Sequence, residues 1–258
     1  MTFTRRQFLH TAALITAALG SSSLSSCQQH HTHTPRTPAN TTKATTLIRQ
    51  TFNGPRFPTG WQAYDNFARS DPRTRWHPKF VDINNNTLRL WGHWDGNRAI
   101  TGGVSNWGQT HQYGQWDITM RATAHPVLSY HLLLWPASDK WPPEIDIAES
   151  FDPERRKTHS FIHYTENGHR TKQSASIDID ATTWHTWSVR WTPTDIHILC
   201  DNSAYAHYTG ETIPHEPMWL AIQVETHASE GRHTSHRDQR PVVILEISDI
   251  TYTPYQPQ

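Results

Sequence analysis

Short segments in which apolar and polar residues alternate recur along this chain, and a period of two is the pattern of a β-strand. The run Asn84-Asn85-Asn86 separates two of them and favours a hairpin turn. The longest helix-compatible stretch beyond the N-terminal region is weak. Many short strands with one apolar face each predict an all-β fold in which two antiparallel sheets pack together. The apolar positions of three such segments are Trp116, Ile118 and Met120; Trp187, Val189 and Trp191; and Met218, Leu220, Ile222 and Val224.

The composition fits one such domain and excludes some functions. The 258 residues are 18% charged with a formal net charge of zero, which argues against a general nucleic-acid-binding protein, because that function needs a basic patch. Most of the 12 Trp residues are expected in the core and a minority along a binding cleft. The 19 His residues include no HExxH motif and no Cys/His zinc spacing, so we expect no metal centre.

The N-terminal region has the pattern of an export signal. Residues 4–10 read Thr-Arg-Arg-Gln-Phe-Leu-His and resemble a twin-arginine signal, and a short apolar stretch over 11–19 follows. Residues 24–27 read Leu-Ser-Ser-Cys and resemble a bacterial lipobox, in which Cys27 is lipidated. Residues 1–27 are therefore predicted to be a lipoprotein signal; a plain cleaved signal peptide is the alternative.

Residues 28–46 are rich in Thr, His, Gln and Pro, which predicts a flexible tether, and residues 47–258 are predicted to form the folded domain. We expect an extracytoplasmic protein anchored by lipid to the outer face of the cell membrane. With Cys27 lipidated, Cys200 has no disulfide partner, and its phase with neighbouring Ile residues predicts a buried thiol.

Three acids occur close together in residues 141–150, Trp-Pro-Pro-Glu-Ile-Asp-Ile-Ala-Glu-Ser. In a regular strand Glu144 and Asp146 share one face, while Glu149 falls on the other. A β-bulge at Ala148 would return Glu149 to the face of the other two acids. Crowded carboxylates repel one another and separate their pKa values, which suits an active site rather than a structural strand. The alternative is a solvated acidic edge strand, but the apolar run 130–136 just before it predicts a central position.

The segments 113–116 (Tyr-Gly-Gln-Trp), 134–136 (Leu-Trp-Pro) and 141–149 together resemble glycoside hydrolase family 16. The segments 101–105, 184–193 and 217–223 continue the resemblance in order along the chain. The resemblance implies a concanavalin-like β-jelly-roll sandwich with a concave cleft that binds a glycan. The bulged spacing of the acids is similar to that of the laminarinase-like branch.

Matched residue by residue, the resemblance implies that Glu144 is the nucleophile, Glu149 the acid/base and Asp146 the assisting carboxylate. The implied activity is that of a retaining endo-acting β-glycan hydrolase, with an endo-β-1,3-glucanase as the first candidate. Pro143 stands where the family often has Gly, and Ala148 is smaller than usual at the bulge. The final strand lacks the Asp-containing ending of the family, which weakens an inference of structural calcium, and we expect no other cofactor.

Residues expected to contact the glycan lie near the acids or on the polar face of a strand. Trp141 and Trp135 are expected to stack on sugar rings, and His163 to face the acids, although each fits a structural role as well. Gln223 and Glu225 lie opposite an apolar stripe, so they either bind glycan hydroxyls or are solvated. The predicted substrate-binding residues are Trp135, Trp141, His163, Trp219, Gln223 and Glu225.

Other functions remain open on the sequence alone. A transglycosylase that remodels a wall polysaccharide would use the same acids. A non-catalytic glycan-binding lipoprotein is disfavoured because it needs no such acids, and no ligand spacing supports a metal-dependent hydrolase. We expect a monomer whose partners are a polysaccharide and, through the lipid, a membrane, with no role for nucleic acid.

Overall fold

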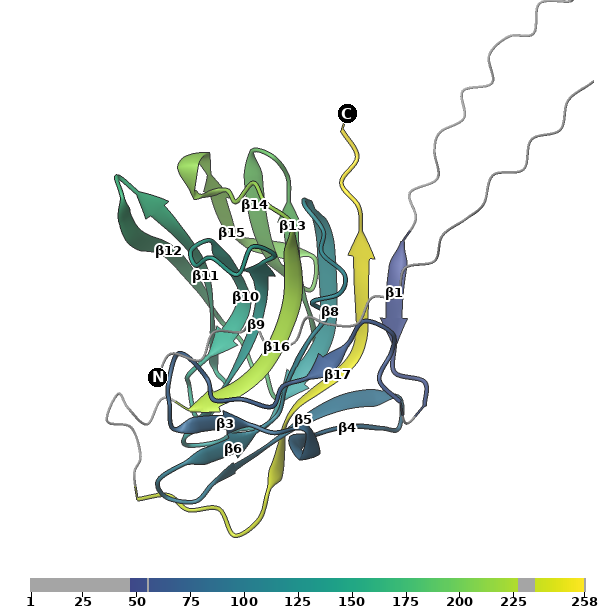
Figure 1. Ribbon diagram of the computed structural model, residues 1–258, viewed down its shortest axis with the longest axis vertical. Helices are drawn as coiled ribbons and strands as arrows, with labels where there is room; N and C mark the ends of the chain where they lie inside the picture. The colour runs from purple at the N-terminus through teal and green to yellow at the C-terminus, as the bar shows by residue number, and fades with distance from the viewer. Residues whose placement is uncertain (1–46, 55, 227–234, 258) are drawn as a thin grey trace, which may run out of the picture. The chain divides into compact units, whose positions relative to one another are not determined.

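The computed structural model describes residues 47–54, 56–226 and 235–257, and these residues form two β-sheets (Figure 1). The predictions for the signal, the tether and Cys27 lie outside the described residues. Only two short 3₁₀ helices, Pro78–Phe80 and Gly210–Thr212, interrupt the strands of the described part. The predicted all-β sandwich with two antiparallel sheets is therefore confirmed.

The ten-stranded sheet has the order β15-β14-β13-β8-β17-β5-β6-β3, with β1 beside β17 and β4 beside β5. Its pairs are antiparallel except β3 with β6, which is parallel and was not predicted. The bounds are β1 Ile48–Thr51, β3 Thr74–Trp76, β4 Val81–Asn84, β5 Thr87–Trp94, β6 Ala99–Thr101, β8 Gly114–Ala122, β13 His185–Trp191, β14 Asp195–Cys200, β15 Ser203–Thr209 and β17 Val242–Thr253.

The seven-stranded sheet has the order β12-β11-β10-β9-β16-β7-β2 and is fully antiparallel. The acidic segment forms β10, between β9 and β11, so the prediction of a central rather than an edge position is confirmed. The bounds are β2 Gln62–Ala63, β7 Gly103–Ser105, β9 Leu128–Pro136, β10 Glu144–Ser150, β11 Lys157–Glu166, β12 His169–Asp178 and β16 Met218–Thr226.

The core lies between the two sheets and is built from the alternate apolar positions of their strands. In β8 every second residue is buried, because one face packs on the other sheet. Trp94, Trp187 and Trp191 are fully buried there, as expected for most tryptophans, and Cys200 is a buried thiol whose pKa burial raises to about 12. The predicted interior role of Cys200 is confirmed.

A second apolar cluster lies on the opposite face of the seven-stranded sheet, which we call its outer face. Leu133, Trp219 and Ala221 form this cluster and Trp135 packs against it. The two faces differ because successive residues of a strand point to opposite sides: Leu132 and Leu134 enter the core, while Leu133 and Trp135 do not. The outer face is thus the surface available for function.

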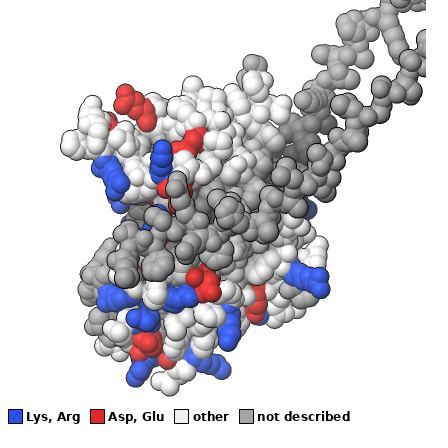
Figure 2. Space-filling model, in the orientation of Figure 1, with Lys and Arg blue, Asp and Glu red and all other residues white. Residues whose placement is uncertain are grey.

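On the face of the molecule that Figure 2 shows, no continuous surface of the described residues carries charge of one sign. Lys and Arg side chains lie among Asp and Glu on the face that Figure 2 shows. Among the described residues, no helix is long and apolar enough to cross a membrane.

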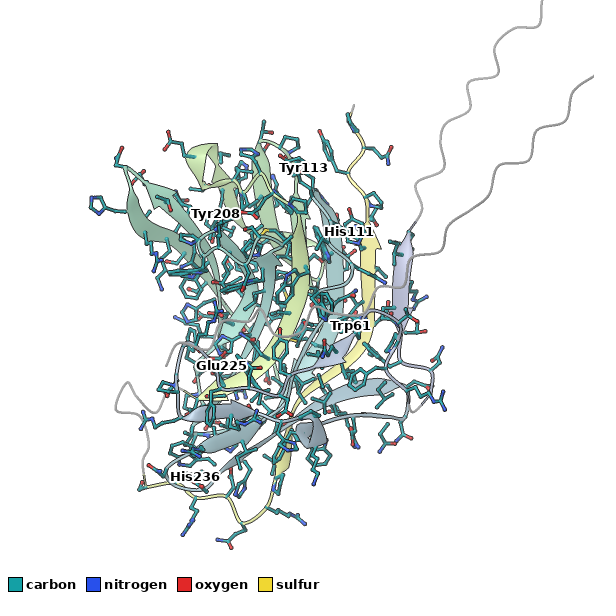
Figure 3. The ribbon with its side chains drawn as sticks, in the orientation of Figure 1. Trp61, His111, Tyr113, Tyr208, Glu225 and His236 are labelled. Carbon is teal, nitrogen blue, oxygen red and sulfur yellow. The ribbon has the colours of Figure 1, made fainter. Side chains whose placement is uncertain are left out.

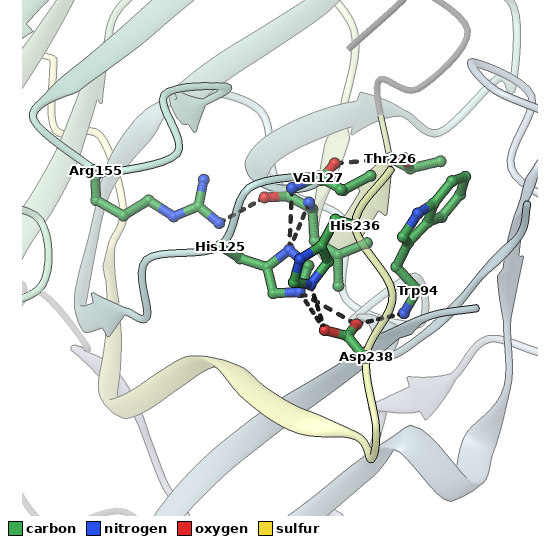
Figure 4. Close-up of polar contacts among 8 residues, drawn as sticks. Trp94, His125, Val127, Arg155, Thr226, His236 and Asp238 are labelled. Carbon is green, nitrogen blue, oxygen red and sulfur yellow. Dashed lines mark hydrogen bonds and ion pairs between the residues drawn. The ribbon is translucent and has the colours of Figure 1, made fainter. Parts of the chain in front are cut away.

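Arg155 ties the ends of several strands together and is expected to dominate local stability. It is fully buried, and its guanidinium donates to the carbonyls of Thr123, Ser150, Asp152 and Leu128 at 2.6–3.2 Å. Figure 4 shows the Arg155 side chain with one of its hydrogen bonds. Burial lowers the pKa of Arg155 to about 10, which leaves it charged at neutral pH. An apolar side chain at this position could not donate hydrogen bonds to the four carbonyls.

We therefore expect Arg155→Met to destabilise the fold by about 3 kcal/mol or more, because it strands buried carbonyls. Urea unfolding of both proteins at pH 7 measures this change as a lower midpoint at an unchanged slope. Arg156→Met is the matched control: its side chain is 66% exposed and pairs with Asp180, so its loss should cost less than about 1 kcal/mol. Equal midpoints for the two variants would show that the Arg155 bonds contribute little.

Candidate active site

A β-bulge in β10 gathers the three acids on the outer face. On β11, Phe161 pairs with Asp146 and His159 pairs with Glu149, so two residues of β10 oppose one residue of β11 between these pairs. The pairing with β9 shifts register at the same place. The extra residue lies at Ile147–Ala148, which is the bulge that the spacing of the acids predicted. Glu144, Asp146 and Glu149 therefore all face away from the core, whereas the two bulge residues are fully buried.

The Glu144 carboxylate accepts a hydrogen bond from Trp141, whose ring lies next to that of His163. Trp141 Nε1 donates to Glu144 Oε2 at 2.5 Å, and His163, its partner on β11, places its ring 5.4 Å from the Trp141 ring. Burial and the nearby charge of Asp146 raise the pKa of Glu144 well above its ordinary value, while the indole N–H opposes that rise. The predicted neighbours Trp141 and His163 are thus brought together with this acid.

Asp146 lies between the two glutamates and is 2% exposed. Burial and the charge of Glu149 raise its pKa well above the ordinary value. His163 Nε2 lies 3.1 Å from Asp146 Oδ2, and burial lowers the pKa of His163. Glu144 and Asp146, whose pKa values are raised, lie with Glu149 at one bulge, and carboxyl groups arranged in this way are able to divide acid and base roles.

Glu149 has a histidine partner that sequence reasoning did not single out. His131 on β9 pairs with Glu149 in register, and its Nδ1 lies 2.5 Å from Glu149 Oε1. Both side chains are buried, at 5% and 8% exposure. The available signal was a single polar residue in the apolar run 130–136, on the same side of the strand as Trp135.

The other residues that were predicted to contact the glycan lie on β9 and β16. Trp219 pairs with Trp135 on the outer face, and Trp135 Nε1 donates to Asp139 at 2.9 Å. Gln223, on the same face of β16, pairs with His131 and is half-buried. Glu225 is only 2% exposed and accepts a bond from the Ser70 hydroxyl. The alternative that Glu225 is solvated is therefore wrong, and its contact with glycan stays a prediction.

A row of rings continues along the outer face of β11. The rings of His159 and Phe161 are stacked with centroids 5.9 Å apart, and the Phe161 and His163 rings follow at 6.1 Å. Cations from β12 lie over this row: Lys172 Nζ is 4.3 Å from the Phe161 ring, and the Arg170 guanidinium is 5.0 Å from the Trp141 ring. Apolar ring faces beside polar groups are a suitable surface for sugar rings.

One cluster with metal-like composition is better explained by hydrogen bonds. His125, His236 and Asp238 bring possible ligand atoms within 4.8 Å of one another (Figure 4). His125 Nδ1 accepts from the backbone N–H groups of Val127 and Leu128, so its proton must sit on Nε2, which donates to Asp238. Burial lowers the pKa of His125 to about 4, so the ring is neutral. A metal at Nε2 would displace this fixed proton, so the cluster fits a structural clamp.

An all-β sandwich with three carboxylates on the outer face of one bulged strand, flanked by Trp and His side chains, is typical of the class of carbohydrate-cleaving enzymes that use a pair of acids. Comparison with known families places the chain more closely. The model of glycosyl hydrolases family 16 matches residues 69–239, which is more than half of the chain, and the chain belongs to this family. The predicted family is confirmed.

Two curated relatives of Rhizobium meliloti (strain 1021) match part of the chain. Endo-1,3-1,4-beta-glycanase ExsH is 32% identical over 92 residues, which cover 35% of this chain and 20% of the relative. Endo-1,3-1,4-beta-glycanase EglC is 28% identical over 102 residues, which cover 39% of this chain and 22% of the relative. The matched part therefore spans about a fifth of the length of these relatives.

Solved structures agree on the fold. A family 16 enzyme of the Bacteroides ovatus mixed-linkage glucan locus, in complex with a product, aligns with a TM-score of 0.69 and 17% identity, covering 79% of this chain and 98% of its own. The laminarinase catalytic domain of Thermotoga maritima MSB8 aligns with a TM-score of 0.68 and 14% identity, covering 83% and 99%. At these identities the likeness establishes the jelly-roll fold alone.

Proposed function

We propose that the chain is a retaining, endo-acting hydrolase of a β-glucan that contains 1,3-linkages. The observation that carries this proposal is the bulged β10, which presents Glu144 and Glu149 on one face with Asp146 between them. Retaining glycosidases need two carboxyl groups on opposite sides of one anomeric carbon. The names of the partial relatives, endo-1,3-1,4-beta-glycanases, support the linkage class.

In the first step an oxygen of Glu144 attacks the anomeric carbon. The bond from that carbon to the glycosidic oxygen breaks, its electron pair goes to the oxygen, and the oxygen takes the proton of Glu149. In the second step water attacks the same carbon and gives a proton to Glu149, and the electron pair of the glycosyl–Glu144 bond returns to Glu144. Trp141 orients Glu144 through the hydrogen bond from its indole N–H, and Asp146 acts on Glu144 through its charge.

The apolar cluster of Leu133, Trp219 and Ala221, with Trp135, lies on the same outer face as the acids. Trp219 and Trp135 are paired across β16 and β9, so their rings lie on neighbouring strands. We infer that they hold sugar units that neighbour the cleaved bond. Binding energy away from the reacting bond is a feature of enzymes that cleave within a chain rather than at its end.

Release of reducing ends from laminarin, mixed-linkage β-glucan, galactan and arabinogalactan is the test of this function. We expect laminarin or mixed-linkage glucan to be cut to oligosaccharides of several lengths early in the reaction, and NMR to show the β-anomer first. Redistribution of chain lengths without new reducing ends would instead indicate a transglycosylase. Binding without any cleavage would indicate a glycan-binding protein and overturn the proposal.

A further inference from the structure

His131 is a buried polar residue in the centre of the seven-stranded sheet, and both nitrogens of its ring are engaged. Nδ1 lies 2.5 Å from Glu149 Oε1, and Nε2 lies 2.8 Å from the Ser129 hydroxyl. A carboxylate only accepts hydrogen bonds, so Nδ1–H is the donor when Glu149 is ionised. A serine hydroxyl either donates or accepts, so Ser129 satisfies Nε2 in both the neutral and the charged imidazole.

A second carboxyl group lies near the pair formed by His131 and Glu149. Glu225 on β16 (Figure 3) is buried, accepts a bond from Ser70, and acts on His131 through its charge. Burial lowers the pKa of His131, but the charges of Glu149, Glu225 and Glu144 oppose that effect, and the net pKa is raised. Burial also raises the pKa of Glu225, while His131 opposes that rise.

The charged and titratable groups around the pair come from five segments of the chain. The His159 ring on β11 is kept neutral because burial lowers its pKa. Lys157 on β11 and Lys172 on β12 are cations that act on this region of β10 and β11. The groups that act on the pair or its neighbours are Glu144 and Asp146 from β10, Glu225 from β16, Asp71 through its effect on Glu225, Lys157, His159 and His163 from β11, and Lys172 from β12.

We propose that His131 is the positioning residue of the acid/base: its Nδ1–H holds Glu149 Oε1, which reserves Oε2 for the proton that moves between Glu149, the glycosidic oxygen and water. The inference rests on the proposed function. Without the histidine, either oxygen of Glu149 is free to rotate toward the sugar. Held by His131, the carboxyl group keeps one geometry through both steps of the reaction.

The same contact makes Glu149 and His131 titrate as one unit. When the pair holds one exchangeable proton, that proton sits either on Glu149 or on His131, and the two forms interconvert. The pair then gives up this proton at a higher pH than Glu149 would beside a neutral residue, because two sites share it. Activity therefore persists to higher pH, and its alkaline limb reports the pair.

The decisive experiment is the pH dependence of kcat/KM for wild type and His131→Gln. We expect kcat to fall about ten- to a hundred-fold with a smaller change in KM, because the reacting oxygen is no longer held in place. The alkaline limb should move about one pH unit to lower pH, because a glutamine cannot store the proton. Glu225→Gln should move the limb in the same direction by less, since it removes a charge that favours protonated His131.

His159→Gln is the matched control, because His159 also pairs with Glu149 in register but is neutral. It should leave the alkaline limb in place. An unmoved limb in a folded His131→Gln variant would overturn the inference. If wild type cleaves no glycan, the proposed function fails instead. The NMR titration of the His131 ring carbon in the free protein then decides separately, because a fall in its pKa in Glu149→Gln is expected and an unchanged pKa rejects the coupling.

Discussion

Glu144→Ala is expected to lose hydrolysis of every glycan that wild type cleaves, by about 10⁴-fold or more, which corresponds to roughly 5 kcal/mol or more of transition-state stabilisation. The reason is that no other group is placed to form the covalent bond to the sugar. Glu144 is the acid that Trp141 Nε1 contacts at 2.5 Å, and Asp146 adjoins it on the same strand. Reducing-end assays on the best substrate of wild type measure the loss.

The same variant should gain a synthetic activity. An α-glycosyl fluoride resembles the glycosyl-enzyme in configuration and enters the space that the removed carboxylate leaves. An acceptor sugar attacks the anomeric carbon, gives its hydroxyl proton to Glu149, and fluoride departs with the electron pair of the carbon–fluorine bond. Mass spectrometry should therefore find elongated β-linked products that Glu144→Ala does not cleave.

Two controls separate this result from unfolding. Glu166→Ala removes an exposed glutamate at the far end of β11 and should keep full hydrolysis. Burial raises the pKa of Glu144 in the folded state. At a pH above the pKa of this residue in the unfolded chain, its ionisation therefore destabilises the fold. Glu144→Ala removes this destabilisation at pH 7. The melting temperature should therefore stay within about 4 °C of wild type. Near-normal turnover by Glu144→Ala would refute its assignment as nucleophile.

The arrangement of the acids could be predicted because it is local. Within six residues the alternation of side chains fixes which acids share a face, and the third acid needs one extra residue to join them. The apolar run just before the acids correctly indicated a central strand. Apolar and polar residues alternate less regularly in residues 242–252. The reason is that β17 shifts register against its neighbours at Val243–Leu245 and Ile247–Asp249.

The buried residues next to the acids, His131 and Glu225, could not be predicted because their positions depend on pairing between distant segments. His131 meets Glu149 only through the register of β9 with β10. Glu225 reaches the same place because β16 pairs with β9 after a long excursion of the chain through the other sheet. A polar residue opposite an apolar stripe is usually solvated, and only the contact with Ser70 reveals why Glu225 is not. Arg155 was missed for a related reason, since two of its carbonyl partners, Thr123 and Leu128, lie 32 and 27 residues away along the chain.

Glu149→Ala is expected to lose about 10²–10⁴-fold in kcat/KM on natural glycans, because their leaving oxygen needs a proton. The loss should nearly vanish for the first step on an aryl glycoside with an acidic leaving group, since such a phenolate departs without protonation. The glycosyl-enzyme should then accumulate, because no base activates the water. A burst of phenolate followed by slow turnover is the expected trace.

Azide tests the geometry of this step. The small anion fits the space that the Glu149 side chain leaves and attacks the anomeric carbon without a base, and the electron pair returns to Glu144. The product should be the β-glycosyl azide, because two inversions retain configuration. Glu144→Ala should form no β-azide by this route, since it makes no glycosyl-enzyme, and the exposed Glu166→Ala should hydrolyse normally. If Glu149→Ala instead kept natural-glycan activity with its alkaline limb intact, another group would be the proton donor, and the bulge in β10 would have no catalytic purpose.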